Sequence, residues 1–451
     1  MRVSVLWARV ASGASLLLLL LLLLLRARLR PELRVERGPE GPEAPAFPPG
    51  PVAPVAPEES PRSPDPAAAI RRLVLRMNAE QRPRNAGRAL TWRPGGPVVV
   101  VQVHSRAAHL RLLVESLGAV RGIETALLVF SHDEVSEEVD AVVRGVRFCQ
   151  VLQIFYPFSA QLHAASFPGP DPRDCPRNAS PLEAQRLGCT NAATPDRFGH
   201  YREAAFTQAK HHWWWKLHFV WRGLRMLRGH PGPVLLLEED HFVLPDALAL
   251  LASMGEVRRL NCADCDLLSL GVLGPAVGGA AAAAAGTEAV DVAPWHSSRH
   301  NTGMAVMRTG YEKLSRCGRA FCTCDDYNWD WSVQLASVDC VPRGAMLVLA
   351  TRLPRVLHTG GGCGMHHHRD SCGVQQERAH AMRVLRQMEG ALFPAALSIR
   401  SRNEAAAVRP RLNGGWADPR DWALCLSQEN RTTSPRLDYS LLAGEISGPS
   451  S

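Results

Sequence analysis

The stretch VLLLEEDH, residues Val234–His241, decides the fold class of this chain. Four apolar residues run directly into three acids and a histidine. A short apolar run of this kind is typical of a strand buried on both faces, as in a parallel sheet covered by helices. Such sheets bind ligands beyond the carboxyl ends of their strands. The stretch therefore predicts a buried strand that carries polar side chains to a ligand-binding edge.

The three acids Glu238, Glu239 and Asp240 have two interpretations. Carboxylates are hard oxygen ligands, and a divalent cation that they hold can also bind phosphate oxygens. Alternatively, the strand ends in a solvated acidic turn. These eight residues alone leave both interpretations open.

The rest of the chain alternates strand and helix patterns. An apolar run opening at Val98, VVVVQVHSR, predicts a strand that passes into polar residues. Such alternation is typical of an α/β fold with a mostly parallel sheet flanked by helices. The pattern predicts further strands at Ala126–Phe130, Cys149–Phe155, Asp266–Leu270, Ala305–Met307 and Met346–Leu349, and helices around Leu110–Leu117, Val139–Val143, Tyr311–Arg316 and Asn328–Leu335.

One long helix is predicted from Tyr201 to Leu227, and its centre reads KHHWWWK. Three consecutive tryptophans span more than half of a helix's circumference, so this helix must be buried nearly all round. We expect the tryptophans in the core. Lys210, His211 and His212, nearer the helix start, are the better candidates for ligand contact.

The N-terminus predicts a membrane anchor. Residues Val10–Leu25 carry no charge and end in a run of leucines, with Arg9 before them and Arg26 after them. The run is close to the lower length limit of a spanning helix, and secretory-pathway membranes are somewhat thin. A cleaved signal peptide is the alternative, but the following RARLR offers no convincing cleavage site. We expect a signal anchor with a short cytosolic tail and a lumenal body.

Cysteines and glycosylation motifs agree with a lumenal body. The chain has 12 cysteines, many closely spaced, which suits an oxidising compartment. NAS at Asn178 and NRT at Asn430 are glycosylation acceptor motifs. The net charge of +8 is modest for 451 residues and the arginines are dispersed, so nucleic-acid binding is not favoured.

Composition predicts the domain boundaries. Residues 31–66 are rich in proline, alanine and glutamate and cannot bury a core, which predicts an extended stem. A short helix is expected to start within Ala67–Leu75. The expected organisation is a cytosolic tail at 1–9, an anchor at 10–25, a Pro/Ala-rich stem at 26–95, one folded domain at 96–426 and a polar tail at 427–451.

A second acidic cluster, DDYNWDW, spans Asp325–Trp331. Asp330 stands between two tryptophans, and apolar neighbours raise the pKa of a carboxyl group towards useful general-base strength. Flat aromatic faces also pack against sugar rings. The structural alternative is a helix N-terminus capped by Asp325 or Asp326, with the tryptophans in the core. Asp330 is the candidate base.

Histidines and cysteines near the C-terminus offer further ligands. His358 follows the apolar approach PRVL and could complete a metal site with Asp240, although a lone histidine is more often a core residue. Cys363 and Cys372 bracket three histidines, which fits a zinc site, but in an oxidising lumen a small disulfide loop is preferred. Cys262-Ala263-Asp264-Cys265 has the spacing of a redox motif, yet no thioredoxin-like pattern surrounds it, which favours a tight structural disulfide.

A series of long motifs shares its order and spacing with a known family. Over roughly Val98–Cys425 the chain resembles the alpha-1,6-mannosyl-glycoprotein 2-beta-N-acetylglucosaminyltransferases, or N-acetylglucosaminyltransferases II. The motifs are VQVHSR at Val101–Arg106, FSHD at Phe130–Asp133, FGHYREA at Phe198–Ala204, Lys210–Val220, Leu237–His241, Asp325–Trp331, CGMHH at Cys363–His367 and NGGW at Asn413–Trp416.

The resemblance implies a GT-A glycosyltransferase domain and a set of site residues. Glu238-Glu239-Asp240 would be its version of the DxD motif, with Asp240 and His358 on Mn2+ and Asp330 as catalytic base. Asn301 and Trp329 would contact the acceptor. The residues implied to hold the donor UDP-N-acetylglucosamine are Gln102, Val103, His104, Ser105, Arg106 and Asp133. Those implied to contact either donor or acceptor are Gln208, Ala209, Lys210, His211 and His212. Glu238 and Glu239 would shape the diphosphate pocket from the side.

One departure from the family concerns a loop, and others concern cysteines. Where the family has an arginine-containing loop, residues 274–286 are rich in glycine and alanine and contain no arginine. Either Arg299 or another basic group substitutes, or that contact is lost. Cys324 stands where a tyrosine is expected, and it and Cys149 are the candidate unpaired thiols. The expected pairs are Cys175–Cys189, Cys262–Cys265, Cys317–Cys340, Cys322–Cys425 and Cys363–Cys372.

Taken with the anchor, the resemblance implies an inverting enzyme of the Golgi membrane, single-pass type II, with a lumenal catalytic domain. It would add N-acetylglucosamine in β1,2 linkage to the α1,6-arm mannose of N-glycans on glycoproteins. Two alternatives stay open: a related transferase with another mannoside acceptor, and a catalytically weak lumenal glycan-binding homologue. The sequence does not set the oligomeric state, and a homo-oligomer is compatible with it.

Overall fold

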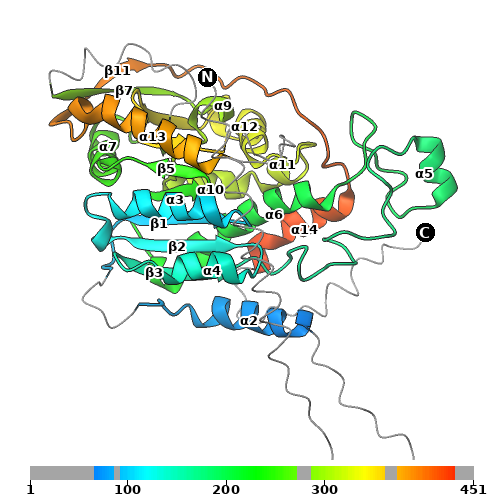
Figure 1. Ribbon diagram of the computed structural model, residues 1–451. Helices are drawn as coiled ribbons and strands as arrows, with labels where there is room; N and C mark the ends of the chain where they lie inside the picture. The colour runs from blue at the N-terminus through cyan, green and yellow to red at the C-terminus, as the bar shows by residue number, and fades with distance from the viewer. Residues whose placement is uncertain (1–65, 86–91, 272–285, 361–372, 432–451) are drawn as a thin grey trace, which may run out of the picture. The chain divides into compact units, whose positions relative to one another are not determined.

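The computed structural model describes residues 66–85, 92–271, 286–360 and 373–431 (Figure 1). All of these belong to the second of two units, 1–62 and 63–451, into which the chain divides. Within the described ranges, no helix combines the length and apolar character needed to cross a membrane. The predicted anchor at 10–25 and most of the predicted stem lie outside the described residues.

A nine-stranded sheet organises the fold, with the strand order β11-β7-β9-β6-β8-β4-β1-β2-β3 (Figure 1). Strands β4, β1, β2 and β3 are parallel, while β8 runs antiparallel between β4 and β6 and β7 is antiparallel to β9. The predicted α/β class with a mostly parallel sheet is confirmed. The strands are β1 Val98–Val103, β2 Leu127–His132, β3 Gln150–Phe155, β4 Val234–Glu238, β6 Cys265–Ser269, β7 Thr287–Pro294, β8 Met304–Val306, β9 Leu347–Thr351 and β11 Ala396–Arg402.

Helices cover both faces of this sheet and enclose two hydrophobic cores. Val99 and Val101 of β1 belong to one core, together with α3, α4 and α7. Val98 and Val100 belong to the other, together with α6, α10, α11, α12 and α14. Burial on both sides explains why β1 and β4 read as unbroken apolar runs. Besides α2, described below, the helices are α3 Ala107–Gly118, α4 Glu137–Arg144, α5 Pro181–Leu187, α6 Ala204–His218, α7 Ala247–Asn261, α9 Ser297–His300, α10 Arg308–Arg316, α11 Gly318–Cys322, α12 Trp329–Asp339, α13 Val374–Met388 and α14 Pro419–Arg431.

Helix α6 is shorter than the predicted helix Tyr201–Leu227. It is followed by a π-helical turn, Phe219–Gly223, and a 3-10 turn, Arg225–Leu227, with the extended residue Leu224 between them. The sequence favoured one helix because the apolar pattern continues through these turns. Trp213, Trp214 and Trp215 are all 1% exposed, so the predicted burial all round is confirmed.

The folded unit begins before residue 96. Helix α2, Pro66–Glu80, packs along β3, the edge strand of the sheet (Figure 1). The Asn78 amide donates to Phe155 O at 2.6 Å and accepts from Phe155 N at 2.8 Å. Asn85 contacts Cys149 O and accepts from Val151 N at 3.0 Å. A segment expected in the stem therefore satisfies the open hydrogen-bonding groups of the edge strand.

The C-terminal boundary also differs, because α14 continues to Arg431, beyond the expected end at 426. The amide of Gln428 donates to the Tyr156 hydroxyl at 3.4 Å, and Arg222 pairs with Glu429 at 2.6 Å. The helix is amphipathic, and its buried side holds these residues against the domain.

Four disulfides join the expected partners: Cys175–Cys189, Cys262–Cys265, Cys317–Cys340 and Cys322–Cys425. Cys149 and Cys324 are buried free thiols, as expected. The expected pair Cys363–Cys372, with the histidines between them, lies outside the described residues.

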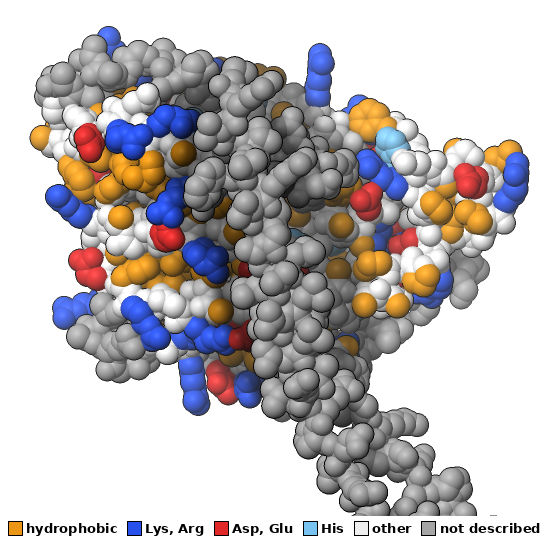
Figure 2. Space-filling model, viewed as in Figure 1, with side chains coloured by type: hydrophobic (Ala, Val, Ile, Leu, Met, Phe, Trp, Pro, Cys, Tyr) orange, Lys and Arg blue, Asp and Glu red, His pale blue; other side chains and the backbone are white. Residues whose placement is uncertain are grey.

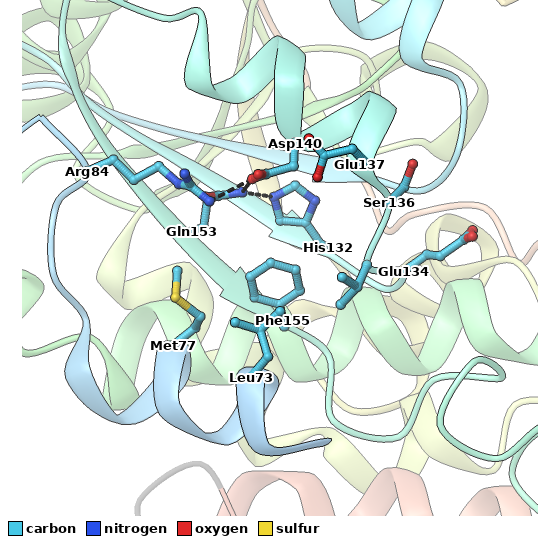
Figure 3. A pocket seen from close by; sticks show the side chains of 11 residues that line it. Leu73, Met77, Arg84, His132, Glu134, Ser136, Glu137, Asp140, Gln153 and Phe155 are labelled. Atoms are coloured by element: carbon cyan, nitrogen blue, oxygen red, sulfur yellow. Dashed lines mark hydrogen bonds and ion pairs between the residues drawn. The ribbon is translucent and has the colours of Figure 1, made fainter. Parts of the chain in front are cut away.

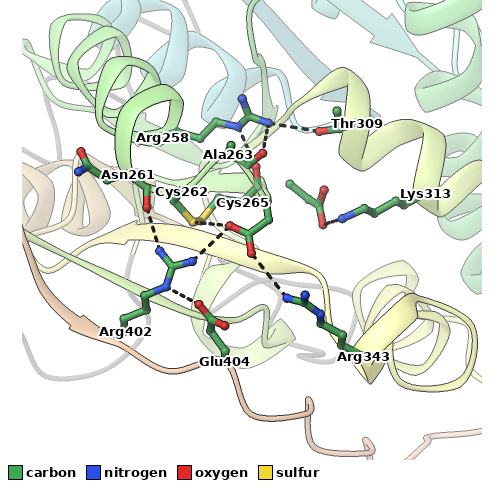
Figure 4. The surroundings of a disulfide bond; sticks show 12 residues. Arg258, Asn261, Cys262, Ala263, Cys265, Thr309, Lys313, Arg343, Arg402 and Glu404 are labelled. Carbon is green, nitrogen blue, oxygen red and sulfur yellow. Dashed lines mark hydrogen bonds and ion pairs between the residues drawn. A yellow bond between two sulfur atoms is a disulfide. The ribbon is translucent and has the colours of Figure 1, made fainter.

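The Cys262–Cys265 disulfide closes the turn between α7 and β6 (Figure 4). Both cysteines are at most 1% exposed. Arg258 donates to the carbonyls of Ala263 and Cys265 at 3.0 and 2.8 Å and so holds the turn from outside. Burial on this scale keeps thiol reagents out, which supports a structural bond over a redox-active one.

A second, two-stranded sheet pairs β5, His241–Val243, with β10, Val356–His358, in antiparallel register. His358 is the partner of His241 in this register. The pairing therefore carries His358 to Asp240, although more than a hundred residues separate them in the chain.

The surface is mixed in character. On the face shown in Figure 2, the arginine and lysine side chains of the described residues alternate with acidic and hydrophobic ones rather than forming a continuous basic stripe.

Candidate active site

Three parallel strands end together and define the site. Gln102 near the end of β1 is in register with Glu238 at the end of β4, and Val103 is in register with His132 of β2. The residues that follow each strand therefore meet at one edge, as expected for carboxyl ends of parallel strands. They include His104, Ser105 and Arg106 after β1, Asp133 after β2, and Glu239 and Asp240 after β4.

Glu239 is 2% exposed, and protein groups occupy its carboxylate. One oxygen accepts the backbone N–H of His104 at 2.7 Å, and the other accepts Nε of Arg106 at 2.8 Å. Glu239 thus fixes the turn that follows β1. These contacts suit a residue that shapes the pocket rather than one that binds a metal.

Asp240 is equally buried but only half satisfied. Its Oδ2 lies 2.8 Å from Nη1 of Arg106 and 3.3 Å from Nε2 of His358, whereas its Oδ1 has no hydrogen-bond partner. Burial acts to raise the pKa of Asp240, but His358 and Arg106 hold that pKa well below its usual range. The hydrogen bond to Asp240 in turn raises the pKa of His358.

These atoms fit a divalent cation. A buried carboxylate oxygen without a partner is costly unless a cation or donor satisfies it. One ligand atom each of Glu238, Asp240 and His241 lies within 4.8 Å of the others. Nδ1 of His241, however, accepts the backbone N–H of Glu238 at 3.2 Å, so His358 is the more accessible imidazole. A Cβ at Gly360 would lie 2.0 Å from Asp240 Oδ2, so only glycine fits beside this carboxylate.

His104 and Asp133 form a charged pair beside the acidic strand end. Nδ1 of the exposed His104 ring lies 2.7 Å from Asp133, and the hydrogen bond raises the pKa of His104 to about 9. His212 approaches the other Asp133 oxygen at 3.4 Å and contacts Ser131 Oγ at 2.8 Å. The site thus presents an imidazolium cation, held from behind by buried groups.

Asp330 lies in the first turn of α12 and is half-buried. Its Oδ2 accepts the side-chain amide of Asn301 at 3.1 Å, and its Oδ1 accepts the backbone N–H of Trp331 at 2.9 Å. Burial raises the pKa of Asp330 to about 7, against the effect of the Trp331 N–H. A carboxylate with this pKa is suited to general-base catalysis at neutral pH.

Trp329 connects the base to the acidic strand end. Its indole N–H donates to Glu238 at 3.2 Å, and its ring stacks on Trp213 of α6 with the centroids 4.5 Å apart. Asp330 follows Trp329 directly, and Asp240 lies two residues after Glu238. The structure therefore brings the predicted base to the side of the predicted metal ligands.

Asp325 and Asp326 do not cap α12, because Asn328 is the residue before its first turn. Asp325 accepts the backbone N–H groups of Arg197 and Trp416, and Asp326 accepts those of Asn328 and Asn413. They tie together the loops around α12.

The implied ligand contacts on α6 differ in position. Gln208 and Ala209 are half-buried, while Lys210, His211 and His212 are at most 1% exposed and contact protein groups. His211 Nε2 lies 2.9 Å from the buried Asp421, and Lys210 donates to backbone carbonyls. Periodicity could not place these side chains, because the helix is buried on every side.

Arg299 is exposed on α9, two residues before Asn301. The loop that it was expected to replace lies outside the described residues except for Gly286. Lys216 and Gly360 were not predicted as site residues. A lysine next to three core tryptophans was the available signal for Lys216.

A separate cavity of about 180 Å³ lies between α2 and the ends of β2 and β3 (Figure 3). Its polar groups pair with one another: Arg84 contacts Asp140 at 2.6 Å, and Gln153 contacts both His132 and Asp140. Burial lowers the pKa of His132 to about 3, so its ring is neutral. The cavity lacks the charge arrangement of the strand-end site.

The carboxyl edge of the sheet thus carries a buried acid with an unsatisfied oxygen, an adjacent imidazole and a nearby carboxylate of raised pKa. Such an arrangement is typical of the active site of an α/β enzyme. The chain belongs to the N-acetylglucosaminyltransferase II family, whose model matches residues 71–425. It is therefore a glycosyltransferase, as the sequence motifs predicted.

Named relatives cover most of the chain. The human alpha-1,6-mannosyl-glycoprotein 2-beta-N-acetylglucosaminyltransferase is 45% identical over 358 residues, which are 79% of this chain and 78% of the human one. The Arabidopsis thaliana enzyme of the same name is 33% identical over 73% of this chain and 74% of its own length. Among solved structures, a mannosyltransferase from Pyrobaculum calidifontis in complex with GDP-Man and Mn2+ is 11% identical, covers 85% of both chains and gives a TM-score of 0.27, too low to establish a shared fold.

Proposed function

We propose that this chain transfers N-acetylglucosamine from UDP-N-acetylglucosamine to the α1,6-arm mannose of N-glycans, forming a β1,2 linkage with inversion. The named relatives carry this activity in their names, and the chain covers more than two thirds of their length. The domain would be a GT-A fold, with the donor at the carboxyl edge of β1, β2 and β4.

The observation that carries the proposal is the position of Asp330 relative to the acidic strand end. Trp329 hydrogen-bonds to Glu238, so the base and Asp240 approach the same space from two elements. Inversion in one displacement needs a base on the acceptor side and positive charge on the leaving-group side. It needs no enzymic nucleophile.

The acceptor reacts at Asp330. The carboxylate, oriented by Asn301 and the Trp331 N–H, takes the proton of the mannose 2-hydroxyl as that oxygen attacks the anomeric carbon. The bond from this carbon to the UDP oxygen breaks, and inversion follows from attack on the opposite side. The exposed Arg299, close in sequence to Asn301, is the basic group proposed to bind acceptor in place of the altered loop.

The donor diphosphate lies against the cationic side of the site. Asp240 and His358 would hold Mn2+, which would supply Lewis-acid charge to the leaving diphosphate. Arg106 and the His104 imidazolium add positive charge at the end of β1, and Glu238 and Glu239 shape the pocket beside them.

A transfer assay of the lumenal domain tests the proposal. The acceptor is an N-glycan with a free α1,6-arm mannose, and the matched control has that mannose already substituted. We expect a β1,2-linked product with Mn2+ and none with EDTA. Folded protein that makes no product would refute the enzyme and support a glycan-binding homologue, and transfer to another mannoside would replace the acceptor.

We further propose a type II Golgi membrane location, with residues 10–25 as anchor. Asn178 is exposed in the structure, as a glycan acceptor must be. Glycosylation of Asn178 in the full-length chain, lost in Asn178→Gln, would support the lumenal domain. An unglycosylated, protease-accessible domain in sealed vesicles would contradict it.

A further inference from the structure

Two lysines of α6 have completely buried side chains, and the roles described above do not explain why a lysine stands at either position. Lys210 is 0% exposed and Lys216 is 1% exposed. A buried ammonium group is costly unless neighbouring groups satisfy it, so each must have a structural or functional compensation. Lys210 contacts the loop that precedes α12, and Lys216 contacts β1.

Lys210 supports the loop that leads to the base. Its ammonium group donates to the carbonyl oxygens of Cys324 and Asp326 at 3.0 and 2.9 Å. It also lies 4.0 Å from the ring centroid of Trp416, a cation–π contact. Asp326 in turn accepts the backbone N–H of Asn328, the residue before the first turn of α12. A continuous set of contacts therefore runs from Lys210 to the turn that carries Asp330.

Lys216 contacts strand β1, whose end is proposed to bind the sugar donor, rather than the loop before α12. Its ammonium group donates to Gln102 Oε1 at 2.7 Å, and Gln102 is in register with Glu238 at the edge of the sheet. Burial lowers the pKa of Lys216 to about 7, and the negative charge of Glu238 opposes this shift. The contact fixes the side chain of Gln102 from behind the strand ends.

We propose that Lys210 and Lys216 are positioning residues with separate targets: Lys210 places the base Asp330, and Lys216 places Gln102 for the donor. Helix α6 is then the rigid element that sets the distance between Asp330 and Gln102. The inference rests on the proposed function for the meaning of base and donor. The family resemblance implied that Lys210 contacts donor or acceptor directly. We assign it a positioning role instead, because its ammonium group contacts backbone carbonyls and a tryptophan ring.

Lys210→Met and Lys216→Met form a matched pair, since each removes one buried charge from the same helix. We expect Lys210→Met to lower kcat by roughly 10- to 100-fold, as misplacement of a catalytic group does, with UDP affinity in Mn2+ within about twofold of wild type. We expect Lys216→Met to weaken UDP affinity by about tenfold. UDP binding is measured by calorimetry, which requires no acceptor.

The buried free thiols give a second measurement that is independent of activity. Cys324 lies in the loop held by Lys210, whereas Cys149 lies directly before β3, far along the chain from that loop. Labelling with a maleimide, followed by peptide mass spectrometry, reports each thiol separately. Lys210→Met should label Cys324 at least about tenfold faster while Cys149 keeps its wild-type rate. Lys216→Met should leave both rates unchanged.

Gln102→Leu provides a test of the second contact. If Lys216 acts through Gln102, the double variant should weaken UDP binding no more than either single variant. Additive losses would overturn the role of Lys216. Equal loss of UDP affinity in Lys210→Met and Lys216→Met, with slow Cys324 labelling in both, would overturn the role of Lys210.

Folding is checked by thermal unfolding of each variant. If Lys210→Met does not fold, Lys210→Gln is used instead. Its amide nitrogen is one bond nearer the backbone than the ammonium group and carries no charge, so the two carbonyls are held less well. Cys324 should then still label faster than in wild type, by a smaller factor, while Cys149 keeps its wild-type rate. UDP binding and thiol labelling stay informative even if the acceptor proves to be another mannoside. Failure of this inference is thus distinguishable from failure of the proposed function.

Discussion

Asn301 donates its side-chain amide to Asp330 Oδ2 at 3.1 Å, and this contact joins α9 to the first turn of α12. The donor stabilises the charged carboxylate and so acts to lower the pKa of Asp330, while burial raises it to about 7. The balance leaves a carboxylate that is ionised near neutral pH and still basic enough to accept a proton.

The first prediction concerns the pH dependence of transfer. Asp330 is active when deprotonated, so kcat should fall as pH drops below about 7. Asn301→Ala removes a donor to the ionised form, which raises the pKa of Asp330 and moves this acidic limb to higher pH, by roughly one unit. The measurement is kcat against pH at saturating acceptor. Asp330→Asn is the control: it should lose roughly 100-fold or more above pH 7, and it should lack the acidic limb. An acidic limb that does not move in Asn301→Ala would assign the limb to another group.

The second prediction separates Asp240 from Glu239 as metal ligands. Asp240→Asn and His358→Ala should each weaken Mn2+ binding by roughly tenfold or more, because each removes one protein ligand. Glu239→Gln should retain most of the affinity, since the backbone N–H of His104 and the guanidinium of Arg106 occupy its carboxylate. Titration of free Mn2+ by electron paramagnetic resonance checks all three. Loss of binding in Glu239→Gln alone would reverse the assignment.

Local apolar patterns predicted the part of the fold that depends on them. The strands from Val98, Ala126 and Cys149 and the strand at Val234–Leu237 are present within one or two residues of expectation. Burial on both sheet faces makes such runs conspicuous in the sequence. Strands β5, β7, β10 and β11 and helices α5, α7, α9, α11, α13 and α14 were not predicted, although α7 contains a clear apolar stripe.

The site was predicted only where neighbours in sequence are neighbours in space. The acids at 238–240 and the indoles around Asp330 were identified from adjacent residues, and their roles came from family motifs. The Trp329–Glu238 hydrogen bond joins residues 91 positions apart in the chain. The Lys210–Cys324 and Lys216–Gln102 hydrogen bonds each join residues 114 positions apart. The pattern of a single sequence does not show which distant residues are in contact, so these contacts could come only from the structure.

The third prediction concerns the cost of burying Lys216. Its pKa is lowered from an ordinary value of 10.5 to about 7 in the folded chain. Between these values the unfolded chain binds more protons than the folded one, so this lysine makes stability rise as pH rises from 7 to 10.5. Lys216→Met removes the effect. The variant should therefore be stabilised relative to wild type most strongly at and below pH 7, and the difference should shrink towards pH 10. Urea unfolding of both proteins at several pH values measures it, and a difference independent of pH would contradict the buried charge.

The last prediction concerns the segment before residue 96. Asn78 and Asn85 hydrogen-bond to backbone groups of β3 that would otherwise form an open sheet edge. Open edges pair with other chains and cause aggregation. A protein starting at residue 96 should aggregate, whereas one starting at residue 63 should be soluble and active. In the longer protein, Asn78→Leu leaves the Phe155 backbone groups unsatisfied and should cost about 1–3 kcal/mol in urea unfolding. Asn261, at the end of α7 and exposed, supplies the matched control Asn261→Leu, with an expected change within about 0.5 kcal/mol. Equal stability of the two variants, together with a soluble protein from residue 96, would show that the edge does not need this segment.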